Sequence, residues 1–217
     1  MRQEHTKLTR IFNFMTYSHS THFHHKPETI SDRIAYGFVY MAARTADLFF
    51  SKRYGHRAVV LETVAAVPGM VGGLLQHLRS LRRFQDDHGL IKTLIDEAEN
   101  ERMHLMVYMH IAKPTIFECL IVLVAQWAVF VGYFFMYIFS PHTAHRFVGY
   151  LEEEAVHSYT GYLAELEAHP RLDVLAPAIA IRYWGLPENA RMTDVVRATR
   201  DDEMRHRDTN HAIANKT

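Results

Sequence analysis

Two short segments of the sequence place a histidine three residues after a glutamate. The first pair is Glu101 and His104, and the second is Glu203 and His206. Residues at i and i+3 of an α-helix project from one face, so each pair could bind a single metal ion. One such pair is weak evidence, because glutamate and histidine are common residues. Two pairs on separate predicted helices favour a metal site.

Two further carboxylate positions lie where two additional helices of such a site would need them. Glu62 is the only charged residue in the apolar run 59–65, where an unpaired buried carboxylate would be costly. The other position falls within the triplet 152–154 between hydrophobic flanks. Periodicity alone does not decide which glutamate of the triplet binds metal, although Glu152 shares a helix face with Tyr159.

The order of these residues predicts a di-metal carboxylate site. Glu62 precedes Glu101 by 39 residues, and Glu152 precedes Glu203 by 51. Each separation suits two helices of about 20 residues joined by a turn, which places the ligands side by side. Bundles of this class use one glutamate from each of two helices and a Glu-x-x-His pair from the other two. The single cysteine excludes a thiolate cluster, and oxygen-rich ligands with two imidazoles favour two irons over zinc.

The elements that must position these residues are all helical. Helical spacing and end signals predict helices over about 31–50, 57–84, 90–112, 115–139, 143–168 and 193–214, with a short helical piece within 170–191. Pro68-Gly69 and Gly72-Gly73 interrupt the helical sequence pattern of the second predicted helix. No segment alternates at period two. We therefore expect an all-α, ferritin-like four-helix di-iron bundle over 30–217, preceded by a polar, histidine-rich arm over 1–29.

The segment 115–139 is apolar enough to span a membrane, with Glu118 as its only charged residue. A crossing would separate the ligands before and after it by about 30 Å. We therefore expect this helix and the first one to attach the bundle to one membrane surface, flanked by Arg44, Lys52 and Arg53. The alternative is a buried core helix.

The formal net charge of the chain is zero, so its charge balance does not indicate binding to nucleic acid.

Four segments together resemble the signature boxes of the alternative oxidases. They are residues 61–65, 100–105, 151–155 and 202–208, and the stretches 68–71 and 183–185 are also similar to that family. The resemblance covers about residues 30–211. It implies a cyanide-insensitive, non-proton-pumping ubiquinol oxidase that reduces O2 to water with two iron ions.

The resemblance also implies a homodimeric, monotopic enzyme of a respiratory chain. Because the first ten residues lack an apolar signal, we expect either a bacterial cytoplasmic membrane protein or a processed protein on the matrix side of the inner mitochondrial membrane.

Roles for individual residues follow from the same resemblance. The implied iron ligands are Glu62, Glu101, His104, Glu152, Glu203 and His206. Tyr159 matches a tyrosine that takes part in electron transfer beside the metals. Residues that orient the ligands are implied at Asn100, Asp202, Trp184 and Tyr183, and quinol contacts at Arg57, Leu61, Glu154, Ala155, Ser158 and His145.

The chain departs from the family pattern at Ala58, where some members have a cysteine. Cys119 lies inside the apolar segment, so we expect no counterpart of the regulatory cysteine of plant members. Three other functions remain open on the residues alone. They are a quinone-ring hydroxylase or other di-iron monooxygenase, an iron-storage bundle, and a structural protein of the membrane surface.

Overall fold

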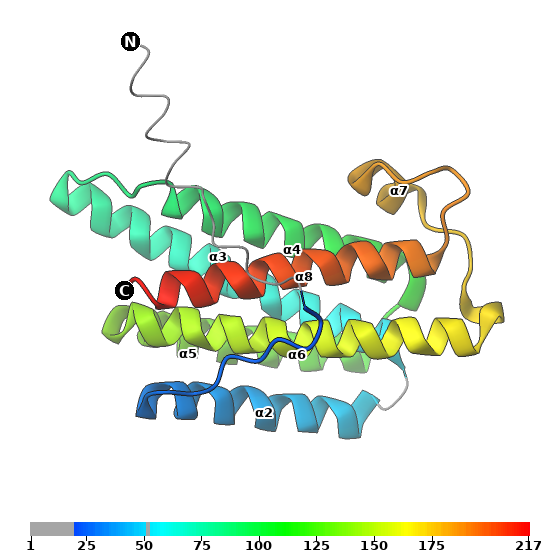
Figure 1. Cartoon of the computed structure of the whole chain (residues 1–217), viewed down its shortest axis with the longest axis horizontal. Helices are drawn as coiled ribbons and strands as arrows, with labels where there is room; N and C mark the ends of the chain where they lie inside the picture. Colours follow the sequence, from blue (N-terminus) through cyan, green and yellow to red (C-terminus); the bar gives the residue numbers. More distant parts are fainter. Residues whose placement is uncertain (1–19, 51–52) are drawn as a thin grey trace, which may run out of the picture.

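The computed structural model describes residues 20–50 and 53–217, and within these ranges the chain folds into seven α-helices and one 3-10 helix (Figure 1). No strand forms in this part of the chain, and the only β-bridge is an isolated pair between Leu175 and Arg191. The all-α prediction is confirmed. The helices are α2 (Ile30–Phe50), α3 (Tyr54–Arg83), α4 (Leu90–Ala112), α5 (Ile116–Phe139), α6 (Pro141–Ala168), α7 (Ala178–Trp184) and α8 (Met192–Ala214), with the 3-10 helix at Pro170–Leu172.

Four of the helices form the bundle that surrounds the candidate ligands. Helix α3 packs along α4, and α6 packs along α8. Side chains from all four meet in one core cluster, which includes Ala58, Val107, Tyr159 and Val195. Helix α2 covers α6, and α5 covers α3. The polar ligands are therefore enclosed by apolar side chains.

Helix α3 runs without a break through Pro68, although the sequence indicates an interruption there. The neighbouring glycine instead allows α4 to approach closely. A Cβ atom on Gly69 would lie 2.5 Å from the Leu94 carbonyl oxygen and 3.0 Å from the Ala98 side chain. Small residues therefore bring α3 and α4 together, which sets the distance between Glu62 and Glu101.

The one charged residue of the apolar segment has a structural role at its start. The Glu118 carboxylate accepts a hydrogen bond of 2.8 Å from the Thr115 backbone N–H, and the Thr115 hydroxyl accepts one from the Glu118 backbone N–H. This is a capping box for α5. The same carboxylate lies 2.9 Å from His56 Nδ1 and 3.6 Å from Arg53.

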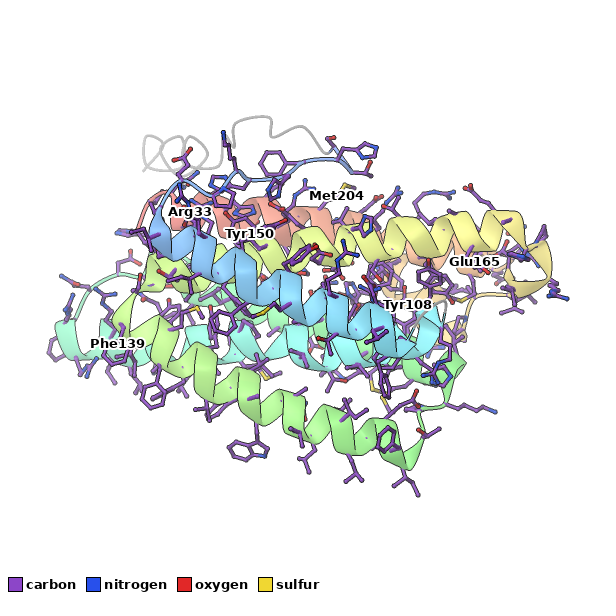
Figure 2. All side chains as sticks on the ribbon, turned by 90° about the horizontal axis from the view of Figure 1, so that it is seen from below. Arg33, Tyr108, Phe139, Tyr150, Glu165 and Met204 are labelled. Atoms are coloured by element: carbon purple, nitrogen blue, oxygen red, sulfur yellow. The ribbon has the colours of Figure 1, made fainter. Side chains whose placement is uncertain are left out.

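Helix α5 exposes most of its apolar side chains. In the part of the chain that the structure describes, α3 and α5 are long and apolar enough to cross a membrane. Of the apolar 18-residue stretch in each helix, 56% is buried inside the bundle in α3 and only 6% in α5. Figure 2 shows α5 along one edge of the bundle with its side chains directed outward. Helix α2 also exposes Ile34, Phe38 and Met41. The alternative of a buried core helix is therefore wrong for 115–139.

The predicted arm over 1–29 is only partly visible, since residues 1–19 lie outside the described residues. Residues 20–29 pack on α6 and α8. The His25 backbone N–H donates to Glu153 Oε1 at 2.8 Å, and His24 Nδ1 lies 2.6 Å from Glu153 Oε2. Arg207 donates to the Ser20 carbonyl oxygen at 3.0 Å. These contacts attach the segment to the outside of the bundle.

Candidate metal centre

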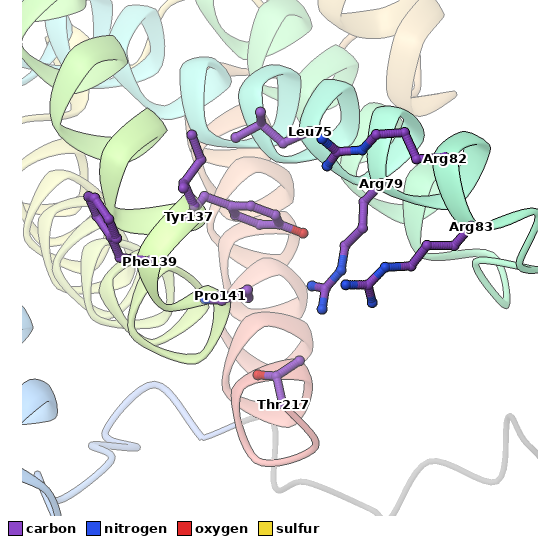
Figure 3. Close-up of a pocket in the computed structure, with 9 residues that line it drawn as sticks. Leu75, Arg79, Arg82, Arg83, Tyr137, Phe139, Pro141 and Thr217 are labelled. Atoms are coloured by element: carbon purple, nitrogen blue, oxygen red, sulfur yellow. The ribbon is translucent and has the colours of Figure 1, made fainter.

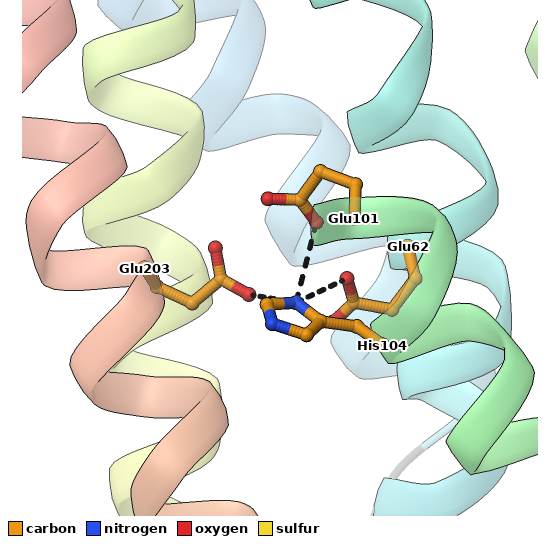
Figure 4. Close-up of side chains that lie close together, drawn as sticks. All are labelled: Glu62, Glu101, His104 and Glu203. Atoms are coloured by element: carbon orange, nitrogen blue, oxygen red, sulfur yellow. Dashed lines mark hydrogen bonds and ion pairs between the residues drawn. The ribbon is translucent and has the colours of Figure 1, made fainter. Parts of the chain in front are cut away.

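The structure brings the six sequence-predicted ligands together in the middle of the bundle. Glu62 comes from α3, Glu101 and His104 from α4, Glu152 from α6, and Glu203 and His206 from α8. They form two groups whose ligand atoms lie within 4.8 Å of one another. The first is Glu62, Glu101, His104 and Glu203 (Figure 4), and the second is Glu101, Glu152, Glu203 and His206. Because Glu101 and Glu203 belong to both groups, the arrangement suits two adjacent cations bridged by these two carboxylates.

The distances show donor atoms converging on two points. His104 Nδ1 lies 3.2 Å from Glu203 Oε1, 3.3 Å from Glu62 Oε2 and 3.6 Å from Glu101 Oε2. His206 Nδ1 lies 2.6 Å from Glu101 Oε1 and 3.5 Å from Glu203 Oε2. Each imidazole therefore directs its Nδ1 atom toward the carboxylates.

The donor set fits cations, because several buried lone pairs have no hydrogen-bond donor. Although His206 Nδ1 and Glu101 Oε1 are only 2.6 Å apart, their contact does not have hydrogen-bond geometry. In the described part of the chain, no hydrogen-bond partner is present for either of these atoms, for the other carboxylate oxygen of Glu101, for both oxygens of Glu203, or for Oε2 of Glu152. Glu62, Glu101, Glu152 and Glu203 are each no more than 2% exposed. Leaving this many buried acceptors unpaired would be costly, whereas coordination to cations satisfies them.

Electrostatics in the cluster point the same way. Burial, followed by repulsion from Glu203 and Glu101, raises the pKa of both Glu62 and Glu152 well above the ordinary carboxyl value. Burial alone would lower the pKa of His104, but the carboxylate of Glu62 and the bond to Asp202 outweigh it and raise that pKa. Four carboxylates at this spacing are stabilised by positive charge placed between them.

The three glutamates of the triplet 152–154 point in different directions around α6. Only Glu152 points into the cluster. Glu153 accepts hydrogen bonds on the outside of α6, including one of 2.9 Å from His211 Nε2. Glu154 lines a separate cavity. The structure thus places one member of the triplet among the ligands.

A buried carboxylate orients the His104 ring. Asp202 Oδ2 accepts hydrogen bonds from His104 Nε2 at 3.0 Å, Trp184 Nε1 at 2.9 Å and Asn100 Nδ2 at 3.0 Å. The bond to Nε2 leaves the Nδ1 lone pair free to face the cluster. Although burial opposes it, the bond to His104 lowers the pKa of Asp202 below its ordinary value. Asn100 also donates to the Tyr183 hydroxyl oxygen at 2.6 Å.

Tyr159 lies directly beside the cluster. Its hydroxyl donates a hydrogen bond to Glu62 Oε1, and the side chain is 2% exposed. Its ring stacks on Tyr108 with the ring centroids 5.6 Å apart. Burial, with the nearby Glu62 charge, raises the pKa of Tyr159 well above 10. The phenol therefore holds its proton at Oη throughout the physiological range.

A cavity of about 570 Å³ lies between α2, α3, α5 and α6. Its lining is largely apolar and includes Leu61, with Arg57 and Glu154 as the charged residues. Arg57 donates to Asp47. Of the six predicted quinol contacts, Arg57, Leu61 and Glu154 line the cavity, whereas the structure does not bring Ala155, Ser158 and His145 to its lining.

His145 lies elsewhere, and its surroundings reveal residues that the sequence reasoning missed. His145 Nδ1 lies 3.0 Å from Asn210 Oδ1, and Asn210 Nδ2 donates to Glu97 Oε1 at 2.6 Å. Glu97 is buried one helical turn before Glu101, and burial raises its pKa to about 7. Its i, i+4 spacing from Glu101 was the available signal for placing it on the cluster side of α4.

Bundle and ligands together define a helical protein with a candidate di-metal carboxylate site, to which four helices each contribute a glutamate and two of them add a histidine. The alternative oxidase family model matches residues 15–215. The chain belongs to the alternative oxidase family.

Relatives of known name agree with this assignment. Ubiquinol oxidase 2, mitochondrial, of Glycine max is 57% identical over 188 residues, which cover 87% of this chain and 56% of the relative. Ubiquinol oxidase 1a, mitochondrial, of Oryza sativa subsp. japonica is also 57% identical, with 87% and 57% covered. Ubiquinol oxidase 2, mitochondrial, of Arabidopsis thaliana is 53% identical. The chain thus spans somewhat over half the length of these relatives.

Proposed function

We propose that this protein is a cyanide-insensitive ubiquinol:oxygen oxidoreductase that transfers four electrons from two ubiquinols to one O2 and yields two ubiquinones and two waters. The observation that carries the proposal is the pair of ligand groups sharing Glu101 and Glu203. The family assignment supports it, as do the ubiquinol oxidase names of the relatives. An iron-storage bundle or a purely structural protein has no comparable support.

Two iron ions are the proposed cofactor. Glu62, Glu101, His104 and Glu203 would hold one, and Glu101, Glu152, Glu203 and His206 the other, while Asp202 fixes the His104 ring. Bound there, the irons supply O2 binding and the redox steps. The buried apolar core around the ligands excludes water from the reacting centre.

The cavity beside α2 and α5 is the proposed ubiquinol site. Its apolar lining suits a ring with a prenyl tail, and its two charged residues can fix the ring oxygens. Arg57, which is 5% exposed and held by Asp47, would donate a hydrogen bond to one ring oxygen. Glu154, whose pKa is raised by burial, would accept a proton from a ring hydroxyl.

Tyr159 is the proposed link between the substrate and the metal ligands. Leu61 lines the cavity, and the next residue, Glu62, accepts the hydrogen bond of Tyr159. When Tyr159 passes on an electron on its way from ubiquinol to O2, its phenolic proton can move along that bond from Oη to Glu62 Oε1. The same proton returns when the tyrosine is reduced again.

We infer attachment to one membrane surface through α2 and α5, whose exposed apolar residues flank the cavity. A substrate dissolved in lipid could then enter without crossing water, and a chain bound to one face has no path for pumping protons. The mitochondrial names of the relatives support a mitochondrial location. We propose the matrix side of the inner mitochondrial membrane, with a bacterial cytoplasmic membrane as the other candidate.

The proposed homodimer has a candidate surface on α3. Met70, Leu74, Leu78 and Leu81 are between 45% and 59% exposed and follow one another at helical spacing. An exposed apolar stripe of this kind suits contact with a second copy.

The proposal is tested by O2 uptake of the purified protein with a short-chain ubiquinol in the presence of cyanide, alongside its iron content. We expect two irons per chain and two ubiquinols consumed per O2. Glu62→Gln should lose iron and uptake, whereas the exposed control Glu188→Gln should retain both. A protein that holds two irons but shows no ubiquinol-dependent uptake, or that inserts oxygen into the quinone ring, contradicts the oxidase and supports the hydroxylase.

A further inference from the structure

A second cavity lies at the end of the bundle opposite α7, where the ends of α3, α5 and α8 meet. Its volume is about 560 Å³, and it is separate from the ubiquinol cavity. Figure 3 shows the guanidinium groups of Arg79 and Arg83 directed into it from α3 and the Tyr137 hydroxyl directed toward them from α5. The lining consists of Leu75, Arg79, Arg82, Arg83, Tyr137, Ile138, Phe139, Pro141 and Thr217.

The cavity lining holds three arginines and neither an aspartate nor a glutamate. No hydrogen bond or ion pair joins Arg79, Arg82 or Arg83 to another side chain within 20–50 and 53–217, and no acidic residue lines the cavity. Arg79 and Arg83 stand at i and i+4 of α3, a spacing at which like charges repel. An anion between them would remove this repulsion.

A purely local role explains only part of the cluster. Arg82 and Arg83 lie in the last turn of α3, where cations interact favourably with the helix dipole. Arg79 lies before that turn, yet its side chain reaches the same cavity. The Tyr137 hydroxyl adds a neutral donor, since burial raises its pKa to about 12. Two guanidinium groups and a hydroxyl that converge in this way, with the third arginine in the same lining, suit a phosphate group.

The surface next to the cavity is apolar. Ile138 and Phe139, at the end of α5, also line the cavity and are 50% and 81% exposed. The exposed side of α5 continues from them along the edge of the bundle (Figure 2). A ligand that places a phosphate among the arginines can therefore lay a hydrocarbon chain along α5. Free phosphate would leave the apolar part uncovered.

We propose that this cavity binds the phosphate of an anionic phospholipid. The inference rests on the proposed attachment of α2 and α5 to a membrane surface. Arg79, Arg82 and Arg83 neutralise the phosphate, Tyr137 donates a hydrogen bond to it, and the acyl chains follow α5. The lipid anchors the end of the bundle far from α7, while the apolar residues of α2 and α5 supply attachment that does not depend on charge.

The test compares two triple variants with the same change in charge. R79Q/R82Q/R83Q removes the proposed site, and R171Q/R182Q/R197Q removes three exposed arginines elsewhere in the fold. Vesicle flotation measures binding of the full chain to vesicles of neutral phospholipid alone and to vesicles containing anionic phospholipid. A basic residue at an anionic surface contributes about fivefold to binding, so three acting together contribute roughly a hundredfold.

We expect the wild-type protein and the control triple to prefer anionic vesicles, and R79Q/R82Q/R83Q to lose at least tenfold of that preference while binding neutral vesicles normally. Y137F, with the arginines intact, should lose a smaller part. Equal preference in both triples, or no preference in the wild type, overturns the lipid site. No binding to any vesicle overturns the attachment as well, although ubiquinol oxidation could persist.

Two further readouts separate the lipid from other ligands. Native mass spectrometry of the detergent-solubilised protein should show one retained anionic phospholipid per chain in the wild type and none in R79Q/R82Q/R83Q. Millimolar inorganic phosphate that displaces this lipid completely would show a free-phosphate site and overturn the proposal. If R79Q/R82Q/R83Q loses the dimer but retains the lipid, the arginines instead contact an acidic surface of a second copy, and the lipid site is overturned. Melting temperatures of both triples should match the wild type, because these side chains are exposed.

Discussion

Replacing Asp202 by alanine tests whether one buried carboxylate positions the His104 ring for metal binding. In the wild type, Asp202 Oδ2 accepts hydrogen bonds from His104, Trp184 and Asn100. Alanine leaves all three donors without this acceptor. His104 is fully buried, so its Nε2–H cannot turn to water, whereas Trp184 and Asn100 are partly exposed.

The expected cost follows from the burial of these donors. An unsatisfied buried donor costs about 1–3 kcal/mol, and His104 Nε2 carries most of this cost. For a chain of this size, that loss lowers the melting temperature of the metal-free protein by roughly 2–12 °C. Removing the partner that orients a metal-binding histidine typically weakens metal affinity about 10–100-fold. Asp202→Asn retains one acceptor oxygen and should lose less of both.

The assay is an iron titration of the stripped protein at buffered free Fe²⁺, with thermal unfolding measured on the same samples. The matched control is Asp201→Ala, because the Asp201 side chain is half exposed and its one ion pair among the described residues is with Arg200 at 3.9 Å. Asp201→Ala should bind iron like the wild type. If Asp202→Ala also keeps wild-type iron affinity and melting temperature, Asp202 does not position the ring. Equal losses in the two variants would refute the reasoning as well.

Three other predictions concern separate parts of the molecule. Tyr159→Phe should retain two irons but lose most of the O2 uptake, because phenylalanine has no phenol that can give up an electron and pass its proton to Glu62; unchanged uptake would remove Tyr159 from electron transfer. Gly149→Ala should lower the free energy of unfolding, measured in urea, by about 1–3 kcal/mol, because its Cβ would lie 2.5 Å from the His211 ring. The control Gly132→Ala meets no atom within 4 Å and should be neutral or stabilising. Burial lowers the pKa of His25 to about 4 from its ordinary 6.5, so the docking of residues 20–29 should be complete above pH 6.5 and weaken as pH falls toward 4. Hydrogen exchange corrected for intrinsic rates measures this. His25→Gln should reduce the pH dependence and leave the part that comes from Glu153 and His211, whose pKa values are also lowered.

Local patterns in the sequence predict the helices and most of the ligand positions. The predicted range 90–112 coincides with α4, and the other long helices begin and end within a few residues of their predicted bounds. The exception is Pro68, through which α3 runs without a break. Helix periodicity and capping act over a few residues, so they can be read without the fold.

Tertiary packing decided the remaining features of the site. Helix periodicity left the triplet 152–154 open, although the family resemblance implied Glu152, and the rotation of α6 against α8 directs only Glu152 into the cluster. The same packing buries Glu97 beside the ligands and places His145 against Asn210, away from the cavity. The sequence by itself determined a helical protein with four carboxylate positions in order. Only the tertiary structure decided which side chains meet, because the rotation of each helix about its axis is fixed by contacts with distant helices.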